Sequence, residues 1–462
     1  MINNKNILIL GDIFLDVFEN TKVEKISPEK PVQVLSLVKK TELLGGAANV
    51  ANNIKQIGGS PFLISKLSNN NTSKKIQKLL KKNKINHKLF FDNNYSSPEK
   101  RRIVSEDHQF LRVDSEKKIL LNKKHEKEIL NFIKKNISKF EILILSDYAK
   151  GFLNSYLIKA AISLFKKNKK IIITDPKNFN IEIYKGSNFI CPNWLELNQS
   201  LKFYNLKVNN KNVQKLIKLS NSKAYIVTKG SKGLIFYSRK QKEIHIPQKN
   251  VNIYDVTGAG DSFISFVSHL IFNKIDTINS IKFANFACSK IVQKKYTSHL
   301  DLNEFRNLMD IYSSSENLSL ENKIKFWKLA KLKIGIANGC FDIIHSGHLH
   351  LFEKAKQHCD KLIILINSNA SIKKIKGKHR PIIELNERIK FLNMIKCIDH
   401  IIPFDDNTPL RVLKKIVPDI LFKGSDYKKE EVVGFNFLTQ NKKKIKIIKK
   451  YKNLSSSKLI IS

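Results

Sequence analysis

Short apolar runs recur along the first half of the chain and are separated by amphipathic stretches rich in lysine. Four of these mostly aliphatic runs occupy residues 7–10, 142–145, 171–174 and 224–228. Such short runs are typical of strands buried in a mainly parallel sheet, and the amphipathic stretches between them predict the helices that cover it. None approaches the roughly 20 apolar residues that a membrane-spanning helix needs. The pattern predicts an α/β fold.

The pattern breaks in a short polar segment near residues 311–317, and a second α/β series follows. Its apolar runs occupy residues 332–337, 362–366, 400–402, 420–422 and 445–448. The 462 residues exceed what a single hydrophobic core normally supports. We therefore predict two domains, residues 1–315 and residues 316–462, of which the second is a smaller doubly wound, Rossmann-like domain.

The composition gives the chain a large positive charge, which by itself excludes few classes of protein. The formal net charge is +43, but only eight of the 83 basic residues are arginine, and lysine, asparagine and isoleucine are abundant throughout. We interpret the charge as the result of an AT-rich genome. The alternative is a nucleic-acid-binding protein, which would need basic clusters interleaved with aromatic residues. The sequence has no such cluster, so we expect neither nucleic acid nor membrane as a partner.

The cysteines and the first residues bear on the cellular compartment. The five cysteines are odd in number, scattered and never spaced CxxC, which indicates reduced thiols rather than disulfides or a zinc site. The first strand begins almost at once, without the charged and apolar regions of an export signal. We expect a cytoplasmic protein.

One glycine-rich segment is a candidate phosphate-binding loop. The P-loop pattern GxxxxGK[ST] is absent, but Asp255-Val-Thr-Gly-Ala-Gly-Asp261 precedes an apolar helical pattern. The glycines allow a tight turn whose N–H groups, with the helix N-terminus, favour an anion. Asp261 at the start of that helix is placed to accept the proton of an attacking hydroxyl. A capped helix after a glycine-rich turn is the alternative.

This segment resembles the closing motif of the ribokinase-like sugar kinases, and the resemblance spans nearly all of residues 1–310. It implies that Asp261 is the catalytic base and that a sugar is held by Asp12, Asp16, Gly46 and Asn49. It also implies that Asn193 and Glu196 organise Mg²⁺ and phosphates, without a dedicated protein cage for the metal. The nucleotide positions that it implies further are Thr228, Gly230, Gly233, Thr257, Gly258, Ala259 and Gly260.

Three further segments resemble the heptose 7-phosphate kinase branch of these enzymes, namely residues 25–32, 146–151 and 175–177. The resemblance implies that Lys100, Arg102 and Lys177 bind the phosphate of the sugar, since a dianion needs such cations. Solvated surface charges are the alternative for these basic residues. Tyr296 stands where the family usually has glycine near the adenine pocket.

The segment Asn338-Gly-Cys-Phe-Asp342-Ile-Ile-His345-Ser-Gly-His348 is the most specific in the second half. A strand ends at Ala337, and the two histidines fall one helical turn apart near the start of a helix. Both imidazoles can face one phosphate, where their donors and the helix N-terminus stabilise charge on an attacked α-phosphate. A metal site lacks a third ligand at suitable spacing, and a chance buried pair is the remaining alternative.

This half resembles the HxGH cytidylyltransferase-like nucleotidyltransferases over about residues 332–462. The resemblance implies that His345 and His348 are catalytic. It also implies nucleotide contacts at Asn338, Gly339, Phe341, Asp342, Lys376, Arg380, Lys423, Ser455 and Ser456. Asn369 replaces the aspartate that is usual in the adenylyltransferases of this group.

The order of a sugar kinase followed by an HxGH domain resembles one bifunctional family, the heptose 7-phosphate kinase and heptose 1-phosphate adenylyltransferases. The resemblance implies a homodimer acting on small molecules, whose first site phosphorylates the anomeric hydroxyl with Mg²⁺ and ATP. A separate phosphatase then removes the 7-phosphate, and the second site adds AMP and releases pyrophosphate, which yields ADP-heptose for lipopolysaccharide core synthesis. A kinase of another sugar fused to another transferase is one alternative. Loss of one activity through sequence drift is a further alternative, and Tyr296 and Asn369 are the positions to suspect.

Overall fold

The computed structural model describes residues 5–105, 108–239, 241–248, 251–296 and 298–449. The chain separates into two compact units, Met1–Leu308 and Met309–Ser462. The division falls within helix α9 (Leu302–Ser315), whose last residue is the boundary expected from the sequence. Within the described residues, no helix is both long and apolar enough to cross a bilayer.

The first unit contains a nine-stranded sheet of order β13-β12-β11-β10-β9-β8-β1-β4-β5. The strands from β11 to β5 pair in parallel, and β12 and β13 extend the sheet as antiparallel edge strands. The runs predicted at residues 7–10, 142–145, 171–174 and 224–228 all lie in this sheet, which confirms the parallel α/β prediction. The strands are β1 (Asn6–Gly11), β4 (Pro61–Leu67), β5 (Asn86–Phe91), β8 (Phe140–Ser146), β9 (Ile171–Asp175), β10 (Phe189–Ile190), β11 (Ala224–Thr228), β12 (Leu234–Ser238) and β13 (Ile244–Ile246).

Helices cover both faces of this sheet because its central strands are apolar on both sides. One face carries a continuous core with α3 (Lys123–Asn136), α4 (Ser155–Lys167), α5 (Trp194–Phe203) and α6 (Asn210–Leu219). Helix α1 (Ala47–Gln56) contacts β1 and β4, and α7 (Ala259–Phe272) contacts α1, β8 and β9. Helices α2 (Asn71–Lys82) and α8 (Thr277–Ile291) complete the unit.

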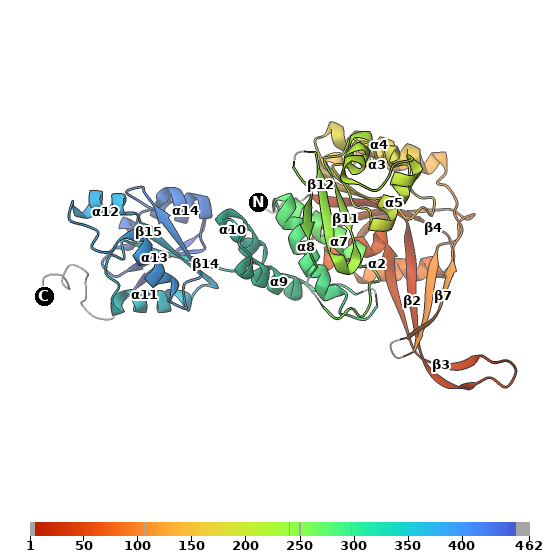
Figure 1. Ribbon diagram of the computed structural model, residues 1–462, viewed down its shortest axis with the longest axis horizontal. Coiled ribbons are helices and arrows are strands. Elements are labelled where there is room, and N and C mark those ends of the chain that lie inside the picture. Colours follow the sequence, from red (N-terminus) through yellow and green to blue (C-terminus); the bar gives the residue numbers. More distant parts are fainter. Residues whose placement is uncertain (1–4, 106–107, 240, 249–250, 297, 450–462) are drawn as a thin grey trace. The chain divides into compact units, whose positions relative to one another are not determined.

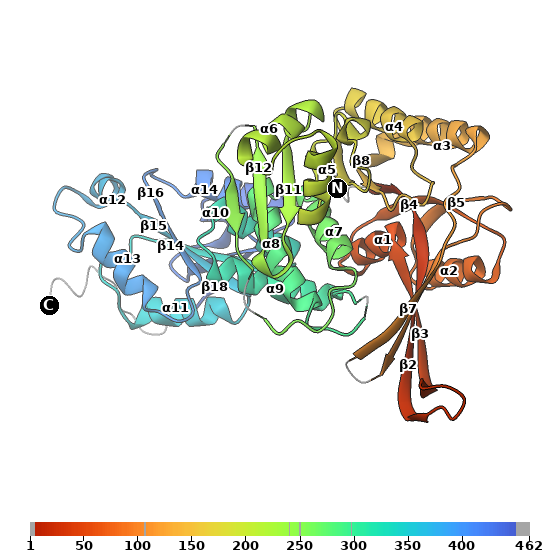
Figure 2. The same ribbon diagram turned by 45° about the vertical axis from the view of Figure 1, so that its right-hand side comes forward.

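A separate four-stranded sheet of order β3-β2-β6-β7 stands beside the main sheet. Its strands are β2 (Ile13–Ile26), β3 (Gln33–Gly46), β6 (Glu99–Ser105) and β7 (His108–Ser115). The distal parts of β2 and β3 form an arm that extends away from the main sheet in both views (Figures 1 and 2). The proximal end of β2 carries Asp16 into the buried region where the two sheets meet α1.

The second unit is a five-stranded, all-parallel sheet of order β16-β15-β14-β17-β18. Because chain connections run both ways from β14, the carboxyl ends of β14 and its neighbours form the switch point where doubly wound sheets bind ligands. The elements are α10 (Leu320–Leu329), β14 (Ile334–Gly339), α11 (Ser346–Lys356), β15 (Lys361–Asn367), α12 (Asn369–Lys376), α13 (Leu385–Asn393), β16 (His400–Phe404), α14 (Leu410–Ile416), β17 (Ile420–Gly424), α15 (Phe435–Gln440) and β18 (Lys444–Ile448). The predicted second doubly wound domain is confirmed.

Candidate active sites

The first site is built on the N-terminus of α7. Gly258 precedes this helix with φ 78° and ψ 2°, a left-handed conformation that glycine adopts without strain. The turn places Asp261 in the first turn of the helix, where its side chain is 5% exposed. Asn49 donates a hydrogen bond to Oδ2 of Asp261 at 2.8 Å, and the Tyr148 hydroxyl donates to Oδ1 at 2.6 Å. The carboxylate is therefore held from both sides.

Burial raises the pKa of Asp261 to about 6, and the hydrogen bonds from Tyr148 and Asn49 oppose that rise. The nearby Asp16 carboxylate raises this pKa further, whereas Lys100 lowers it. A carboxyl group with a pKa near neutrality, close to an anion-binding helix terminus, is suited to general-base work.

The loop that carries Tyr148 is anchored by Asp12. Oδ2 of Asp12 accepts from the N–H groups of Tyr148 at 3.2 Å and Lys150 at 3.0 Å, and Oδ1 accepts from Phe152 at 3.0 Å. Burial raises the pKa of Asp12, and these three backbone N–H groups and Lys66 oppose the rise. Asp12, predicted to bind sugar, thus fixes the loop that follows β8. The motif gave no signal for this role.

The other predicted sugar and phosphate positions form a paired cluster. Asp16 accepts from Arg102 Nη1 at 2.6 Å, and both side chains are almost completely buried. Lys100 Nζ lies 3.8 Å from the centre of the Phe14 ring and 5.4 Å from that of Tyr148, and burial lowers the pKa of Lys100. Arg102 is therefore paired inside the protein, whereas Lys100 lies against the rings of Phe14 and Tyr148.

Gly46 lies at the junction of β3 and α1, beside Asp12. Its φ is 62°, and a Cβ at this position would lie 2.5 Å from the backbone oxygen of Asp12. The glycine predicted at this position is therefore required by the backbone. Sugar contacts at Asp12, Asp16, Gly46 and Asn49 stay predictions.

A cavity of about 250 Å³ opens in front of Asp261. Asn193 and Glu196 line it and form a reciprocal capping box on α5, so both residues also cap this helix. Lys177 Nζ forms an ion pair with Glu196 Oε1 at 2.9 Å. This lysine, predicted to bind the sugar phosphate, therefore already has an acidic partner. The described lining residues are Asp147, Tyr148, Asp175, Lys177, Cys191, Asn193, Glu196, Thr228, Gly258, Gly260, Asp261, Phe263 and Ile264.

Two carboxyl groups in this cavity had no predicted role. Burial raises the pKa of Asp147 to about 6 and that of Asp175 well above its usual value, and the neighbouring carboxylates add to the rise at Asp175. Both residues follow buried strand residues at the carboxyl ends of β8 and β9, the position where ligands bind in parallel sheets. The position of these two aspartates at the end of an apolar run was the feature of the sequence that could have identified them as site residues.

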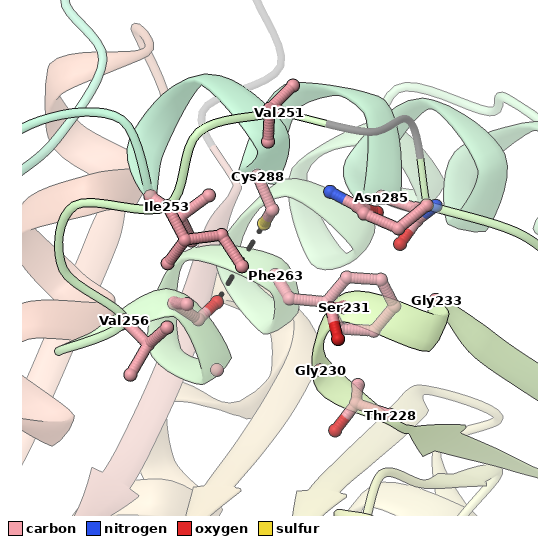
Figure 3. Close-up of a pocket in the computed structure, with 14 residues that line it drawn as sticks. Thr228, Gly230, Ser231, Gly233, Val251, Ile253, Val256, Phe263, Asn285 and Cys288 are labelled. Carbon is pink, nitrogen blue, oxygen red and sulfur yellow. Dashed lines mark hydrogen bonds between the residues drawn. The ribbon is translucent and has the colours of Figure 1, made fainter.

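A second cavity of about 340 Å³ shares Thr228, Gly260 and Phe263 with the first. Figure 3 shows apolar side chains from Ile253, Val256 and Cys288 on one side and the Thr228 to Gly233 turn on the other. The predicted nucleotide residues Thr228, Gly230, Gly233, Ala259 and Gly260 line this cavity. Its apolar wall and its connection to the Asp261 cavity suit a purine base with phosphates reaching toward α7.

Two predicted features of the nucleotide region lie outside these linings. Thr257 donates its N–H to Asp255 at 2.8 Å in the turn before α7. Tyr296 has φ 63°, the left-handed region that the usual glycine would favour, and its hydroxyl bonds Asn20. Tyr296, which replaces the usual glycine, therefore lies beside β2, and the centre of its ring is 4.6 Å from that of Phe18.

The site in the second unit is a cavity of about 480 Å³ at the carboxyl ends of β14, β15 and β17. His345 precedes α11 and His348 lies in its first turn, with ring centres 3.9 Å apart and nearly parallel. The Nδ1 atoms of both histidines have no hydrogen-bond partner among the described residues. The helix places two imidazoles together, as the HxGH spacing predicted.

Burial lowers the pKa of His348 to about 4, with added effects from His345 and Lys376, and it lowers the pKa of His345. Both imidazoles are therefore neutral near pH 7 and each offers one N–H donor. Burial also lowers the pKa of Lys423 to about 8. Lys376 and Lys423 line the same cavity, as do Asn338, Gly339 and Phe341.

Asp342 and Arg380 bind each other rather than lining this cavity. Arg380 Nη1 donates to Asp342 at 2.7 Å, and Ile382 and Ile383 add backbone N–H donors. Burial opposes ionisation of Asp342, but these donors outweigh it and lower its pKa. The structure gives both residues a role in fixing the 380–383 segment; nucleotide contacts by them stay predictions. Ser455 and Ser456 lie outside the described residues.

A completely buried arginine joins the strand ends behind the cavity. Arg388 donates to the carbonyl oxygens of Cys340, Asn367 and Ile383, and to Oδ1 of Asn369 at 2.7 Å. Asn369, the departure from the usual aspartate, is thus engaged as an acceptor. Arg388 had no role predicted from its motif, because its partners are dispersed along the chain.

Comparisons with known proteins find a family match in each of the two units. Residues 4–303 match the pfkB family of carbohydrate kinases, and residues 336–461 match the cytidylyltransferase-like family. The fold resembles ribokinase from Thermotoga maritima (TM-score 0.52, 19% identity, 66% of this chain and 99% of that one). It also resembles phosphofructokinase-2 from Escherichia coli (TM-score 0.55, 18% identity, 66% and 98%). The chain therefore joins a carbohydrate kinase to a cytidylyltransferase-like domain.

Relatives with the same domain order extend over nearly the whole chain. The bifunctional protein HldE of Helicobacter acinonychis is 34% identical over 94% of this chain and 94% of its own. That of Campylobacter jejuni strain RM1221 is 34% identical over 98% and 96%. The chain belongs to the HldE family of bifunctional proteins, which confirms the family resemblance found in the sequence.

Proposed function

We propose that the first unit phosphorylates the anomeric hydroxyl of D-glycero-D-manno-heptose 7-phosphate with ATP, and that the second adenylylates heptose 1-phosphate to ADP-heptose. Membership of the HldE family over nearly the whole chain supports this pair of reactions. The observation that carries the kinase half is Asp261, held at the N-terminus of α7 where two connected cavities meet. The product is a precursor for the lipopolysaccharide core.

In the kinase reaction, Asp261 accepts the proton of the sugar hydroxyl. The hydroxyl oxygen forms a bond to the γ-phosphorus of ATP while the bond from that phosphorus to ADP breaks and ADP leaves. The N–H groups of the first turn of α7 stabilise the charge on the transferring phosphoryl group. The cavity lined by Thr228, Gly230 and Gly233 holds the nucleotide, with the phosphates directed toward Gly260. Lys100 is the cation that we assign to the sugar phosphate.

Magnesium fits the residues of this site. Mg²⁺ usually takes one or two protein carboxylates together with substrate phosphates and water. Glu196 and Asp175 offer such oxygens in the Asp261 cavity, and Asn193 adds an amide oxygen. A cation there would relieve the crowding of carboxylates that raises the pKa of Asp175. When bound, the ion neutralises phosphate charge; the described residues contain no group of three or more metal-ligating His, Cys, Asp or Glu side chains.

In the second reaction, an oxygen of the sugar 1-phosphate attacks the α-phosphorus of ATP and pyrophosphate leaves. His345, His348 and the start of α11 supply donors to the α-phosphate oxygens as their charge grows. Lys376 and Lys423 supply positive charge from two other elements that line the cavity. No covalent intermediate with the protein is needed.

The remaining parts of the proposal concern the protein in the cell. We propose a cytoplasmic homodimer whose partners are ATP and heptose phosphates, and whose domains divide at residue 315. The net charge of +43 would attract these anionic substrates. Nucleic-acid binding is expected to be weak and to vanish near physiological salt.

Separate assays with the two sugar phosphates test the proposal. Asp261→Ala should lower kinase turnover by roughly 10²- to 10⁴-fold, the usual contribution of a general base, and should leave adenylylation intact. His348→Ala should lower adenylylation by on the order of 10²- to 10³-fold and leave the kinase intact. Normal phosphorylation by Asp261→Ala, or loss of both reactions from one substitution in a folded protein, would show that the assignment is wrong. A panel of other sugar phosphates tests the alternative substrate.

A further inference from the structure

The Tyr148 hydroxyl makes a direct contact with the carboxylate that the kinase reaction uses. Its hydrogen bond to Oδ1 of Asp261 is 2.6 Å long, whereas Asn49 serves the other oxygen at 2.8 Å. Burial of the hydroxyl raises the pKa of Tyr148 well above its usual value, and the Asp261 carboxylate raises it further. The phenol is therefore protonated at every working pH and donates to the Asp261 carboxylate when that group is ionised.

The position of Tyr148 is fixed by two independent sets of contacts. Its backbone N–H is one of three that bind Asp12, and the next residue, Ala149, has φ 56°, so the loop is held in an unusual conformation. Its ring packs against Phe14 at 5.2 Å in an edge-on arrangement, with Lys100 Nζ 5.4 Å from its centre. The hydroxyl is thus directed at Asp261 by both backbone and ring.

We propose that Tyr148 is a positioning residue of the kinase reaction, whose hydroxyl holds the Asp261 carboxylate ionised and oriented for the sugar hydroxyl. This inference rests on the proposed function, in which Asp261 takes that proton. A carboxylate has about four acceptor positions on its two oxygens. The sugar hydroxyl can therefore bind Asp261 while Tyr148 and Asn49 keep their own hydrogen bonds.

The surrounding charges make this hydrogen bond consequential. Asp16 on β2 and Asp175 on β9 are carboxyl groups close to the Tyr148 and Asp261 pair, and Lys100 on β6 is a nearby cation. Asp147, Lys177 and Glu196 line the same cavity as this pair. Burial and Asp16 favour the protonated, inactive form of Asp261, and the donors Tyr148 and Asn49 oppose them. Removal of one donor shifts this balance toward the protonated acid.

The test is the pH dependence of kinase kcat/KM in Tyr148→Phe. The acidic limb should move upward by about one pH unit, the effect of one lost hydrogen bond to a charged group. Kinase kcat/KM near pH 6 should then fall roughly fivefold, because the ionised fraction of Asp261 drops from about one half to about one tenth. Adenylylation by the same sample should be unchanged. Tyr225→Phe is the matched control, because Tyr225 is buried in the same unit and its hydroxyl bonds Ser220 instead of a carboxylate.

A second variant keeps the shape of the side chain in case the phenylalanine protein does not fold. With 3,5-difluorotyrosine at position 148, the more acidic phenol is a stronger donor and should move the acidic limb below that of the native protein. An unchanged limb in both variants, or a faster kinase in Tyr148→Phe, would overturn the inference. If Asp261→Asn also phosphorylates normally, the proposed function fails instead.

Discussion

Replacement of Asp261 by asparagine should stabilise the kinase unit while it removes the proposed catalytic base. Asp261 is 5% exposed, and burial raises its pKa from 3.8 to about 6. The folded state therefore binds a proton more tightly than the unfolded state does. Proton binding by Asp261 therefore contributes to the free energy of unfolding. This contribution is fully present below about pH 4 and is lost as the pH rises toward 6. At pH 8 the ionised carboxylate destabilises the fold, and asparagine removes that cost.

The magnitude follows from the pKa difference. A rise from 3.8 to about 6 corresponds to about 3 kcal/mol at pH 8. Asparagine offers an oxygen to only one of the donors Tyr148 and Asn49, and the mismatch at the other costs about 1–2 kcal/mol. The net gain at pH 8 is then about 1–2 kcal/mol. At pH 5 it should be smaller by about 1 kcal/mol, because part of the native carboxyl is already protonated.

The two tryptophans allow the unit to be followed separately. In a Trp327→Phe background, Trp194 on α5 is the single fluorescent reporter of the kinase unit. Urea unfolding of Asp261→Asn and its parent at pH 5 and pH 8 gives the four free energies needed. Glu128→Gln on exposed surface of α3 is the control for loss of one negative charge. A destabilised variant at pH 8, or an equal difference at both pH values, would refute the reasoning.

Two further results are expected. Arg388→Met should destabilise the second unit by about 3–5 kcal/mol, because the carbonyl oxygens of Cys340, Asn367 and Ile383 and the side chain of Asn369 lose a donor that is itself buried. Trp327 fluorescence in a Trp194→Phe background is the measure. Unfolding unchanged by that substitution would mean that the arginine is dispensable. Exhaustive removal of divalent cations should abolish both reactions, and Mg²⁺ should restore them; full turnover by the chelated enzyme would contradict the proposed role of the metal.

The sequence predicted the sheets because their strands are short, aliphatic and buried on both faces. It did not predict the arm formed by β2 and β3, although the two strands pair as an antiparallel hairpin with a short connecting loop. The distal residues of the arm are mostly polar or exposed, so they lack the buried apolar run from which the other strands were predicted. The arm is defined by cross-strand hydrogen bonds rather than by burial.

In the two candidate sites, the sequence predicted the residues that are placed by their neighbours in the chain, but not those whose partners are far away in sequence. Motif spacing placed Asp261 at a helix N-terminus and His345 beside His348, because each arrangement depends on residues within one turn. It could not assign Tyr148 or Arg388, since the first bonds a carboxylate 113 positions away and the second bonds strand ends up to 48 positions away. Pairing of Arg102 with Asp16 was equally hidden, because it depends on the register of β2 and β6.

The neutral histidines of the second site lead to a prediction about proton uptake. Burial lowers the pKa of His348 to about 4, so His348 lacks charge at pH 6 in the free protein, and burial also lowers the pKa of His345. ATP phosphates beside them would favour the charged form and raise both pKa values. ATP binding should then take up protons at pH values between about 4, the pKa of His348 in the free protein, and its higher pKa in the complex. The affinity for ATP should weaken as the pH rises from 6 to 8.

Calorimetry of ATP binding in buffers of different ionisation enthalpy measures this uptake directly. The native protein at pH 6 should take up a fraction of a proton per ATP at the second site, and His348→Asn should take up less, since asparagine keeps a donor without titrating. ATP at the kinase site contributes equally to both proteins and cancels in the difference. Identical uptake by both would mean that His348 stays neutral in the complex. The α-phosphate would then be stabilised by N–H donors and by Lys376 and Lys423 alone, and adenylylation by His348→Asn would show no altered acidic limb.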